Sequence, residues 1–230
     1  GGFDAEGLAA CRAQREGVGR LSRERVGAEM AKLLAAPDPG PALRAMVEAG
    51  VMAEVWPEAP DEPVFVRAVA LERALARPPD WLTRLAALFP RKGGELAERL
   101  RLSKAETARL KTVQGENAPA ELDLSPARIR AEVYRRGGEE CLDMLLGRWV
   151  ASGADPQAQD WRAAYDLARD WSPPVFPLTG ADAMAAGLKP GPDVGGVLRE
   201  VEAWWIGQEF EPDEAALRAR LAVAVEERRR

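Results

Sequence analysis

The sequence contains no histidine among its 230 residues, and this absence removes several kinds of catalytic site. Histidine is the commonest general base and zinc ligand, and Ser-His and Cys-His catalytic pairs depend on it. The two cysteines, Cys11 and Cys141, lie far apart in the sequence and do not make a disulfide framework. We therefore predict no metal site and no catalytic residue in this chain, and its cysteine content fits a reducing cytoplasm.

Long apolar runs are also absent. No stretch reaches the length of a membrane span, and no charged start followed by an apolar segment indicates a signal peptide, so we expect no membrane partner. The net charge of −5 is unusual for a nucleic-acid-binding domain. The charge is uneven, however: residues 91–136 carry 11 basic and 7 acidic side chains, and residues 137–230 carry 10 and 17. A basic middle could meet a polyanion, although a solvated helical surface accounts for most such charges.

Apolar residues recur at helical spacing along the chain, and proline or glycine ends almost every segment. No segment shows the alternation of a strand. The predicted class is all-α, an irregular array of about ten or more short helices with no repeat period. We expect helices over residues 4–15, 23–36, 41–49, 63–76, 81–89, 93–100, 103–114, 125–136, 139–150 and 159–171, and later ones starting near 181, 194 and 213. The arginines at 128, 130, 135 and 136 are expected to face outward, and Arg228–Arg230 to fray.

The stretch from Phe176 to Phe210 has the densest pattern. Thr179 is a good N-cap for a helix over 181–186, and Gly187 is a good stop for it. The following Lys189–Pro192 cannot be helical inside because it contains two prolines. Asp193 is then the expected cap of the next helix.

That next helix opens with Val194, Gly195 and Gly196, and glycine leaves the amides of a helix start uncovered, where a phosphate could bind. Lys189 and Arg199 would add positive charge beside it. The alternative is a plain helix-turn-helix corner, since short loops of this kind are common.

An earlier stretch reads as a strong helix. Ser22 is its expected cap, and Glu24 lies in the first turn, where the helix dipole favours a negative charge. Glu29 follows Arg25 by four residues and is expected to pair with it as a weak surface ion pair.

Four segments in order resemble the C-terminal half of the bacterial class II CCA-adding tRNA nucleotidyltransferase and poly(A) polymerase family. They are Leu21–Leu34, with its Ser, Glu-Arg and Lys-Leu-Leu; Ala42–Pro57; Arg99–Ser103; and Pro177–Gly207, with Leu-Thr-Gly-Ala-Asp and Gly-Leu-Lys-Pro-Gly-Pro. The last is the most specific, and their order and spacing agree along nearly the whole chain.

The resemblance implies a fold like the C-terminal region of poly(A) polymerase, with residues 1–36 as the end of the neck, 37–173 as a helical body and 174–230 as a helical tail. In that family a head carries the Gly-Ser loop and the metal-binding carboxylates, and the neck selects CTP or ATP. Neither motif is found here. We therefore expect a fragment that is inactive alone, whose head domain would be its partner and would bind Mg²⁺ and the nucleotide.

The resemblance also implies a role: body and tail hold the acceptor stem and elbow of tRNA. By this analogy a neck-like group is Glu24, Arg25 and Glu29, and a tRNA-binding group is Lys189, Gly191, Gly195, Gly196 and Arg199. Residues that choose among CCA, CC, A or poly(A) addition lie upstream. The competing hypothesis is a non-catalytic acidic helical protein-interaction module, with an exposed apolar patch around Trp204 or Trp205.

Overall fold

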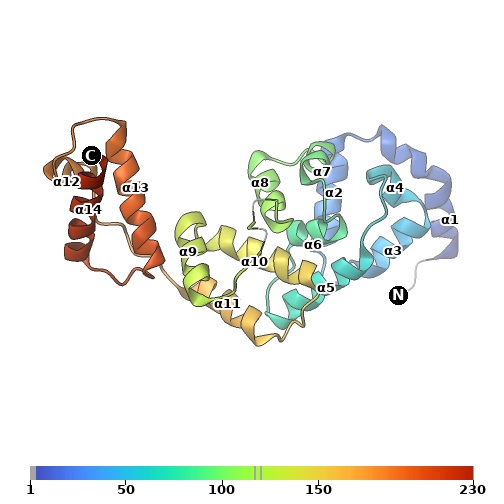
Figure 1. The fold of residues 1–230 in the computed structure, drawn as a ribbon. Helices are drawn as coiled ribbons and strands as arrows, with labels where there is room; N and C mark the ends of the chain where they lie inside the picture. The colour runs from blue at the N-terminus through green and yellow to red at the C-terminus, as the bar shows by residue number, and fades with distance from the viewer. Residues whose placement is uncertain (1–3, 117, 120, 230) are drawn as a thin grey trace. The chain divides into compact units, whose positions relative to one another are not determined.

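The computed structural model describes residues 4–116, 118–119 and 121–229. Within these ranges all regular structure is helical and no strand occurs, which confirms the all-α prediction (Figure 1). The elements are α1 (Ala5–Gln14), the 3-10 helix η1 (Arg15–Arg20), α2 (Arg23–Ala35), α3 (Gly40–Glu48), α4 (Val51–Val55), α5 (Glu62–Ala74), α6 (Trp81–Leu88), α7 (Gly93–Arg99), α8 (Lys104–Val113), α9 (Pro126–Arg136), α10 (Gly138–Ser152), α11 (Gln159–Asp170), α12 (Gly180–Ala185), α13 (Pro192–Gly207) and α14 (Glu214–Arg229).

The chain divides into two compact units, which we describe separately. Unit 1 contains residues 1–122 and 142–165, and unit 2 contains residues 123–141 and 166–230. The long helices α10 and α11 each contribute residues to both units. Each unit has a hydrophobic core of its own.

The helices differ from the prediction in four main places. The 3-10 helix η1 between α1 and α2 and the short helix α4 were not among the expected helices. Helix α13 begins at Pro192 with Gly191 as its N-cap residue, so Asp193 lies inside the first turn and is not the cap. Proline suits the first helical position because that position needs no amide partner. Helix α14 continues to Arg229, so Arg228 does not fray, and Arg230 lies outside the described residues.

A buried ion pair lies at the centre of unit 1. The guanidinium of Arg84 on α6 is 2.8 Å from the carboxylate of Glu72 on α5, and both side chains are almost completely buried. The same guanidinium donates to the backbone carbonyls of Leu34 and Ala36 at 2.7 and 2.6 Å. Glu72 also accepts from the backbone amide of Asp80 at 3.1 Å. One side chain therefore joins α5 and α6 to the C-terminal end of α2, whose last carbonyls lack helical partners.

Burial raises the pKa of Glu72 above its usual range, because desolvation outweighs the hydrogen bonds from Asp80 and Arg84 that favour the carboxylate. The charge of Glu72 is thus tolerated in the core only while Arg84 faces it. We infer that this pair is a constraint on the arrangement of three helices, and not a large net source of stability.

Two glycines of unit 1 let helices approach backbone closely. A Cβ on Gly147 of α10 would lie 1.7 Å from the carbonyl oxygen of Val113, and one on Gly27 of α2 would lie 2.2 Å from that of Leu100. Neither carbonyl can move aside as a flexible side chain would. Both positions therefore require glycine for packing, not for backbone conformation.

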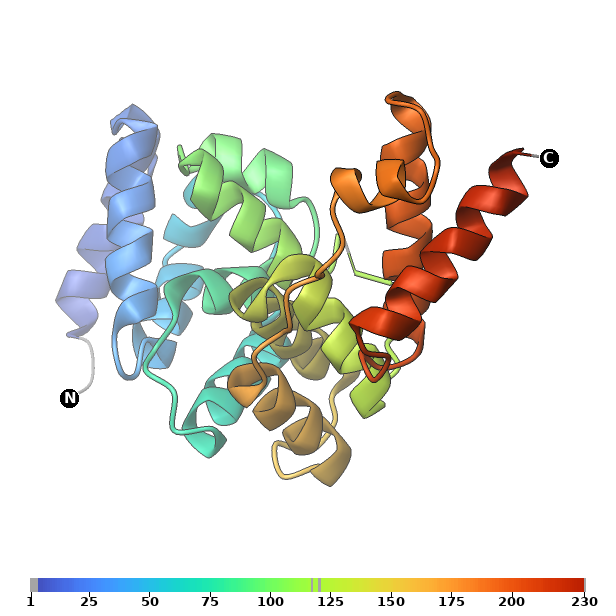
Figure 2. The ribbon, with the colours of Figure 1, turned by 90° about the vertical axis from the view of Figure 1, so that its left-hand side faces the viewer.

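Unit 2 is built on α13 and α14, which pack side by side (Figure 2). Val197, Val201 and Leu217 are among its fully buried residues. Trp205 is buried too, and its indole N–H donates to the carbonyl of Pro212 at 3.0 Å. The expected apolar patch around Trp204 or Trp205 is therefore wrong: Trp205 is a core residue, and Trp204 is half-buried against the same core.

The arginines of α9 surround an acidic residue that the prediction overlooked. Glu132 is only 2% exposed and lies 3.0 Å from Arg128, 3.8 Å from Arg135 and 2.6 Å from Arg136. Arg130 forms another ion pair within unit 2 at 3.0 Å. All four arginines expected to face outward thus pair with carboxylates, and Arg128, Arg130 and Arg136 are partly buried while Arg135 is exposed.

The buried pair leads to a stability prediction. Arg84→Met should lower the free energy of unfolding by about 3–5 kcal/mol, because it leaves Glu72 charged and unpaired in the core. Adding Glu72→Leu should recover part of that loss, although the carbonyls of Leu34 and Ala36 remain without their donor. Urea denaturation measures both values. A double variant as unstable as Arg84→Met would contradict the ion-pair explanation.

The glycine contacts lead to a second prediction. Gly147→Ala should destabilise the protein by about 3 kcal/mol or more, since a methyl group cannot fit against a backbone carbonyl without moving a helix. The matched control is Gly17→Ala in η1, where no atom lies within 4 Å of the added carbon. Equal unfolding midpoints for the two variants in urea would show that α8 and α10 are not packed as described.

Candidate nucleic-acid interface

The corner between α12 and α13 begins with a hydrogen-bonded cap. Thr179 is the N-cap residue of α12, as predicted, and the carboxylate of Asp182 accepts from its amide at 2.8 Å and from its hydroxyl at 2.7 Å. Arg218 of α14 donates to the same carboxylate at 2.6 Å. The bonds from Thr179, followed by the one from Arg218, lower the pKa of Asp182 to about 2. This acidic group stays ionised and ties α12 to α14.

The loop that follows has the predicted glycine stop. Gly187 has a φ of +106°, and the amide of Leu188 donates back to the carbonyl of Ala183 at 3.2 Å. A residue with a Cβ is strained in this left-handed region, so the glycine allows the chain to leave α12. The loop then carries the exposed Lys189 towards the start of α13.

The two glycines in the first turns of α13 leave space beside the helix, and two arginine side chains occupy it. The guanidinium of Arg199 lies 3.3 Å from the position that a Cβ on Gly195 would take. A guanidinium nitrogen of Arg228 lies 2.5 Å from the corresponding position on Gly196. The missing side chains therefore make room for two arginines against the helix, and these bring positive charge to it.

Arg228 is a member of this site that the sequence reasoning missed. The guanidinium of Arg228 lies 3.8 Å from the carboxylate of Asp193 and 3.9 Å from that of Glu200. Glu200 also pairs with Arg220, at 2.7 Å. Arg228 is about thirty residues from Gly196 in the sequence, so no local spacing relates the two. The only signal was the basic end of the chain, which we interpreted as frayed.

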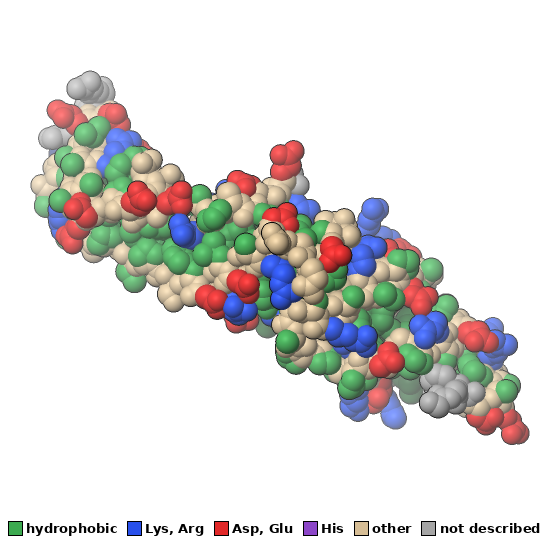
Figure 3. Space-filling view, turned by 90° about the horizontal axis from the view of Figure 1, so that it is seen from below, with side chains coloured by type: hydrophobic (Ala, Val, Ile, Leu, Met, Phe, Trp, Pro, Cys, Tyr) green, Lys and Arg blue, Asp and Glu red, His purple; other side chains and the backbone are tan. Residues whose placement is uncertain are grey.

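The corner thus combines the positive end of a helix dipole with Lys189, Arg199 and Arg228. Lys189 and Arg199 are exposed, and in the described part of the chain neither has an ion-pair partner. Gly191, the N-cap residue, and the prolines beside it keep this approach free of bulky side chains. The exposed Asp193 reduces the positive potential. Elsewhere, acidic and basic side chains are interspersed on the face seen in Figure 3.

The neck-like group lies on α2 in unit 1, and all three of its side chains are exposed. Glu29 pairs with Lys32 at 3.0 Å, so its predicted pairing with Arg25 is wrong. Glu24 lies 3.7 Å from Arg101. Two of the three therefore form ion pairs with residues outside the group.

Three of the four segments that carry the resemblance nevertheless meet inside unit 1. Gly27 of the first packs on the carbonyl of Leu100 in the third. Arg99 of the third donates to the carbonyls of Glu54 and Val55 in the second. These contacts involve backbone groups, and they are specific to glycine and arginine at those positions. They therefore join α2, α4 and α7.

Metal ligands do not gather in the described residues, where no group of three or more Asp, Glu or Cys side chains is arranged to hold an ion. We assign no residue of the chain to a metal. Among the same residues, no helix combines the length and apolarity needed to cross a membrane.

Comparison with known proteins points to nucleic-acid chemistry. Residues 3–62 match the family described as "Probable RNA and SrmB- binding site of polymerase A". The chain is 25% identical to the mitochondrial CCA tRNA nucleotidyltransferase 1 of Danio rerio over 89% of its own length and 47% of that protein. It is 39% identical to the "Uncharacterized 28 kDa protein in petA 5'region" of Rhodospirillum rubrum over 36% of its length and 32% of that protein.

The chain therefore spans less than half the length of these curated relatives. The family match lies at α1–α4 and the start of α5, and the alignment with the Danio rerio protein covers most of both units. The order of the four segments agrees with these two findings. Both findings agree with the resemblance of this chain to the CCA-adding tRNA nucleotidyltransferase and poly(A) polymerase family.

Proposed function

We propose that this chain is the tRNA-holding helical region of a tRNA nucleotidyltransferase. It would position the acceptor end for addition of CMP and AMP without a template, and a separate catalytic head would carry out the transfer. The observation that carries the proposal is the similarity to a CCA tRNA nucleotidyltransferase over 89% of the chain. The match of residues 3–62 to an RNA-binding family supports it.

In this proposal residues 1–36 are the end of the neck, 37–173 the body and 174–230 the tail. Glu24, Arg25 and Glu29 would brace the neck. The head would hold Mg²⁺ and CTP or ATP, and the protein would act in the cytoplasm on the acceptor stem and elbow of tRNA. None of these assignments requires a catalytic residue in the chain.

The α12–α13 corner is the tRNA contact that we propose within the tail. Its unpaired cations, Lys189 and Arg199, are separated by a glycine-proline loop and a helix start, the arrangement that suits a phosphate group. Arg228 is bound to two carboxylates, so we assign it a supporting role. Contacts of this kind position a nucleic acid and do not read its sequence.

The salt dependence of tRNA binding tests this contact. Each phosphate contact adds roughly 0.9 to the slope of log affinity against log salt, so Lys189→Ala with Arg199→Ala should reduce the slope by about 1.8. Filter binding or fluorescence anisotropy with a tRNA transcript measures it. Asp193→Asn should strengthen binding at low salt, because it removes a negative charge from the corner.

The control variant removes the same number of positive charges from another part of the surface. Lys104→Ala with Arg169→Ala removes two exposed cations outside the corner and should leave the slope nearly unchanged. An equal reduction in both double variants would assign the effect to net charge and remove the corner from the site. Absence of salt-dependent tRNA binding by the unmodified chain would favour the protein-interaction hypothesis.

The assignment of catalysis to a separate head gives a further prediction. Incubated with tRNA lacking its CCA end, CTP, ATP and Mg²⁺, the chain alone should incorporate no labelled nucleotide. It offers no group of carboxylates for the ion among its described residues. Incorporation above a no-protein control, by a preparation free of host nucleotidyltransferase, would refute the assignment of catalysis to the head.

A further inference from the structure

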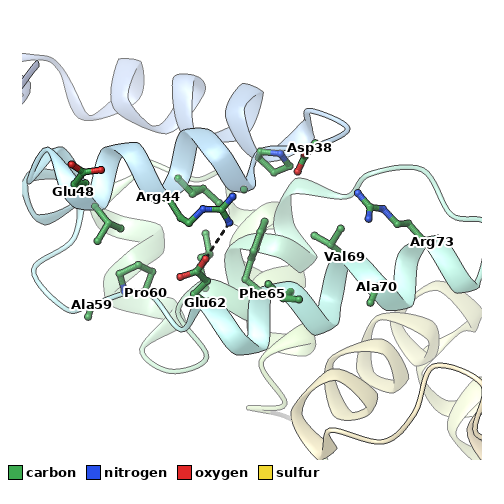
Figure 4. A pocket seen from close by; sticks show the side chains of 16 residues that line it. Asp38, Arg44, Glu48, Ala59, Pro60, Glu62, Phe65, Val69, Ala70 and Arg73 are labelled. Carbon is green, nitrogen blue, oxygen red and sulfur yellow. Dashed lines mark hydrogen bonds and ion pairs between the residues drawn. The ribbon is translucent and has the colours of Figure 1, made fainter. Parts of the chain in front are cut away.

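Helix α5 of unit 1 has apolar furrows on both sides. The furrow towards α3 has a volume of about 430 Å³ and is lined by residues that include Leu43, Val47, Phe65 and Val69 (Figure 4). The furrow on the other side has a volume of about 290 Å³ and is lined by residues that include Trp149. Both furrows therefore leave apolar side chains of unit 1 accessible beside α5.

Val66 stands between the two furrows and lines both, as does Ala70. Val66 is 54% exposed and Val47, across the first furrow, is 47% exposed. Residues 62, 66 and 70 form one ridge of the helix, because residues four apart lie on the same face. A ridge with a small alanine beside a protruding valine suits close packing against another helix.

Charged residues mark the two ends of this ridge. Glu62 lies at the start of α5, and Arg73 lies three turns later on the same face, about 16 Å away by helix geometry. Arg73 is exposed and has no ion-pair partner in the described part of the chain, whereas Glu62 is 3.3 Å from the equally exposed Arg44. Figure 4 shows Arg73 at one end of the furrow and Glu62 nearer its middle, beside Arg44.

The charged ends of this ridge are complementary to those of a second α5 that runs in the opposite direction. A second α5 laid antiparallel on the first would bring Glu62 of each copy to Arg73 of the other, while each Val66 enters a furrow beside the opposite α5. Two-fold interfaces are the commonest in soluble oligomers and require such self-complementarity.

We propose that the chain forms a two-fold dimer through antiparallel packing of α5 against α5 of a second copy. The apolar ridge supplies the contact area, and the two reciprocal Glu62–Arg73 pairs set its direction. The face would be buried in the dimer, which explains why Val47 and Val66 are exposed in one copy.

Sedimentation equilibrium from micromolar to hundreds of micromolar protein tests the dimer. The mass should rise from 25.0 kDa to twice that value as concentration increases. Val66→Glu should remain monomeric throughout, and because this residue is exposed, its circular dichroism should match that of the unmodified protein. The matched control is Val223→Glu, at a valine of unit 2 that is 48% exposed, which should dimerise normally.

A charge reversal tests the direction of packing. Arg73→Glu alone should weaken the dimer by about tenfold, because each Glu62 then faces a like charge. Combining it with Glu62→Arg should restore the original dissociation constant. A mass of 25.0 kDa at every concentration would overturn the proposal, as would a Val66→Glu protein that dimerises normally or a double reversal that fails to restore association.

Discussion

The buried guanidinium of Arg84 is the interaction on which unit 1 depends. It neutralises Glu72 of α5 from α6 and satisfies the last carbonyls of α2 at Leu34 and Ala36. A charge without water has few acceptable positions, so these three helices must meet in one arrangement. The N-terminal half of α2 is positioned by the same constraint, together with the contact of Gly27 on Leu100. Glu72, the other member of this ion pair, fixes helix α5 and its apolar ridge.

Glycine has a consistent use in both units. At Gly27 and Gly147 it admits a backbone carbonyl, and at Gly195 and Gly196 it admits the guanidinium groups of Arg199 and Arg228. The glycine-rich start of α13 therefore makes room for arginine side chains and is also an exposed helix end. This changes the chemistry we attach to the motif: positive side chains of α13 and α14 supplement the helix dipole, and two acidic residues hold one of them in place.

Many charged side chains of this protein are neutralised by an oppositely charged side chain close by. The basic middle of the sequence loses much of its apparent potential, because Glu132 collects three arginines of its own helix. Counting residues therefore overstated the basic character of that region. Lys189, Arg199 and Arg73 are exposed cations without an ion-pair partner in the described part of the chain, and our two proposals use them for different purposes: phosphate contact in unit 2 and self-association in unit 1.

By itself, the sequence determined the helical class, most helix positions and the caps at Ser22 and Thr179, because these depend on residues within a few positions of one another. It also carried the family resemblance, which the comparisons support. Only the tertiary structure decided which charges are paired, that Trp205 is buried, that Arg228 reaches Gly196, and that α5 lies between two furrows. Those features join residues tens of positions apart, and local spacing carries no information about such partners.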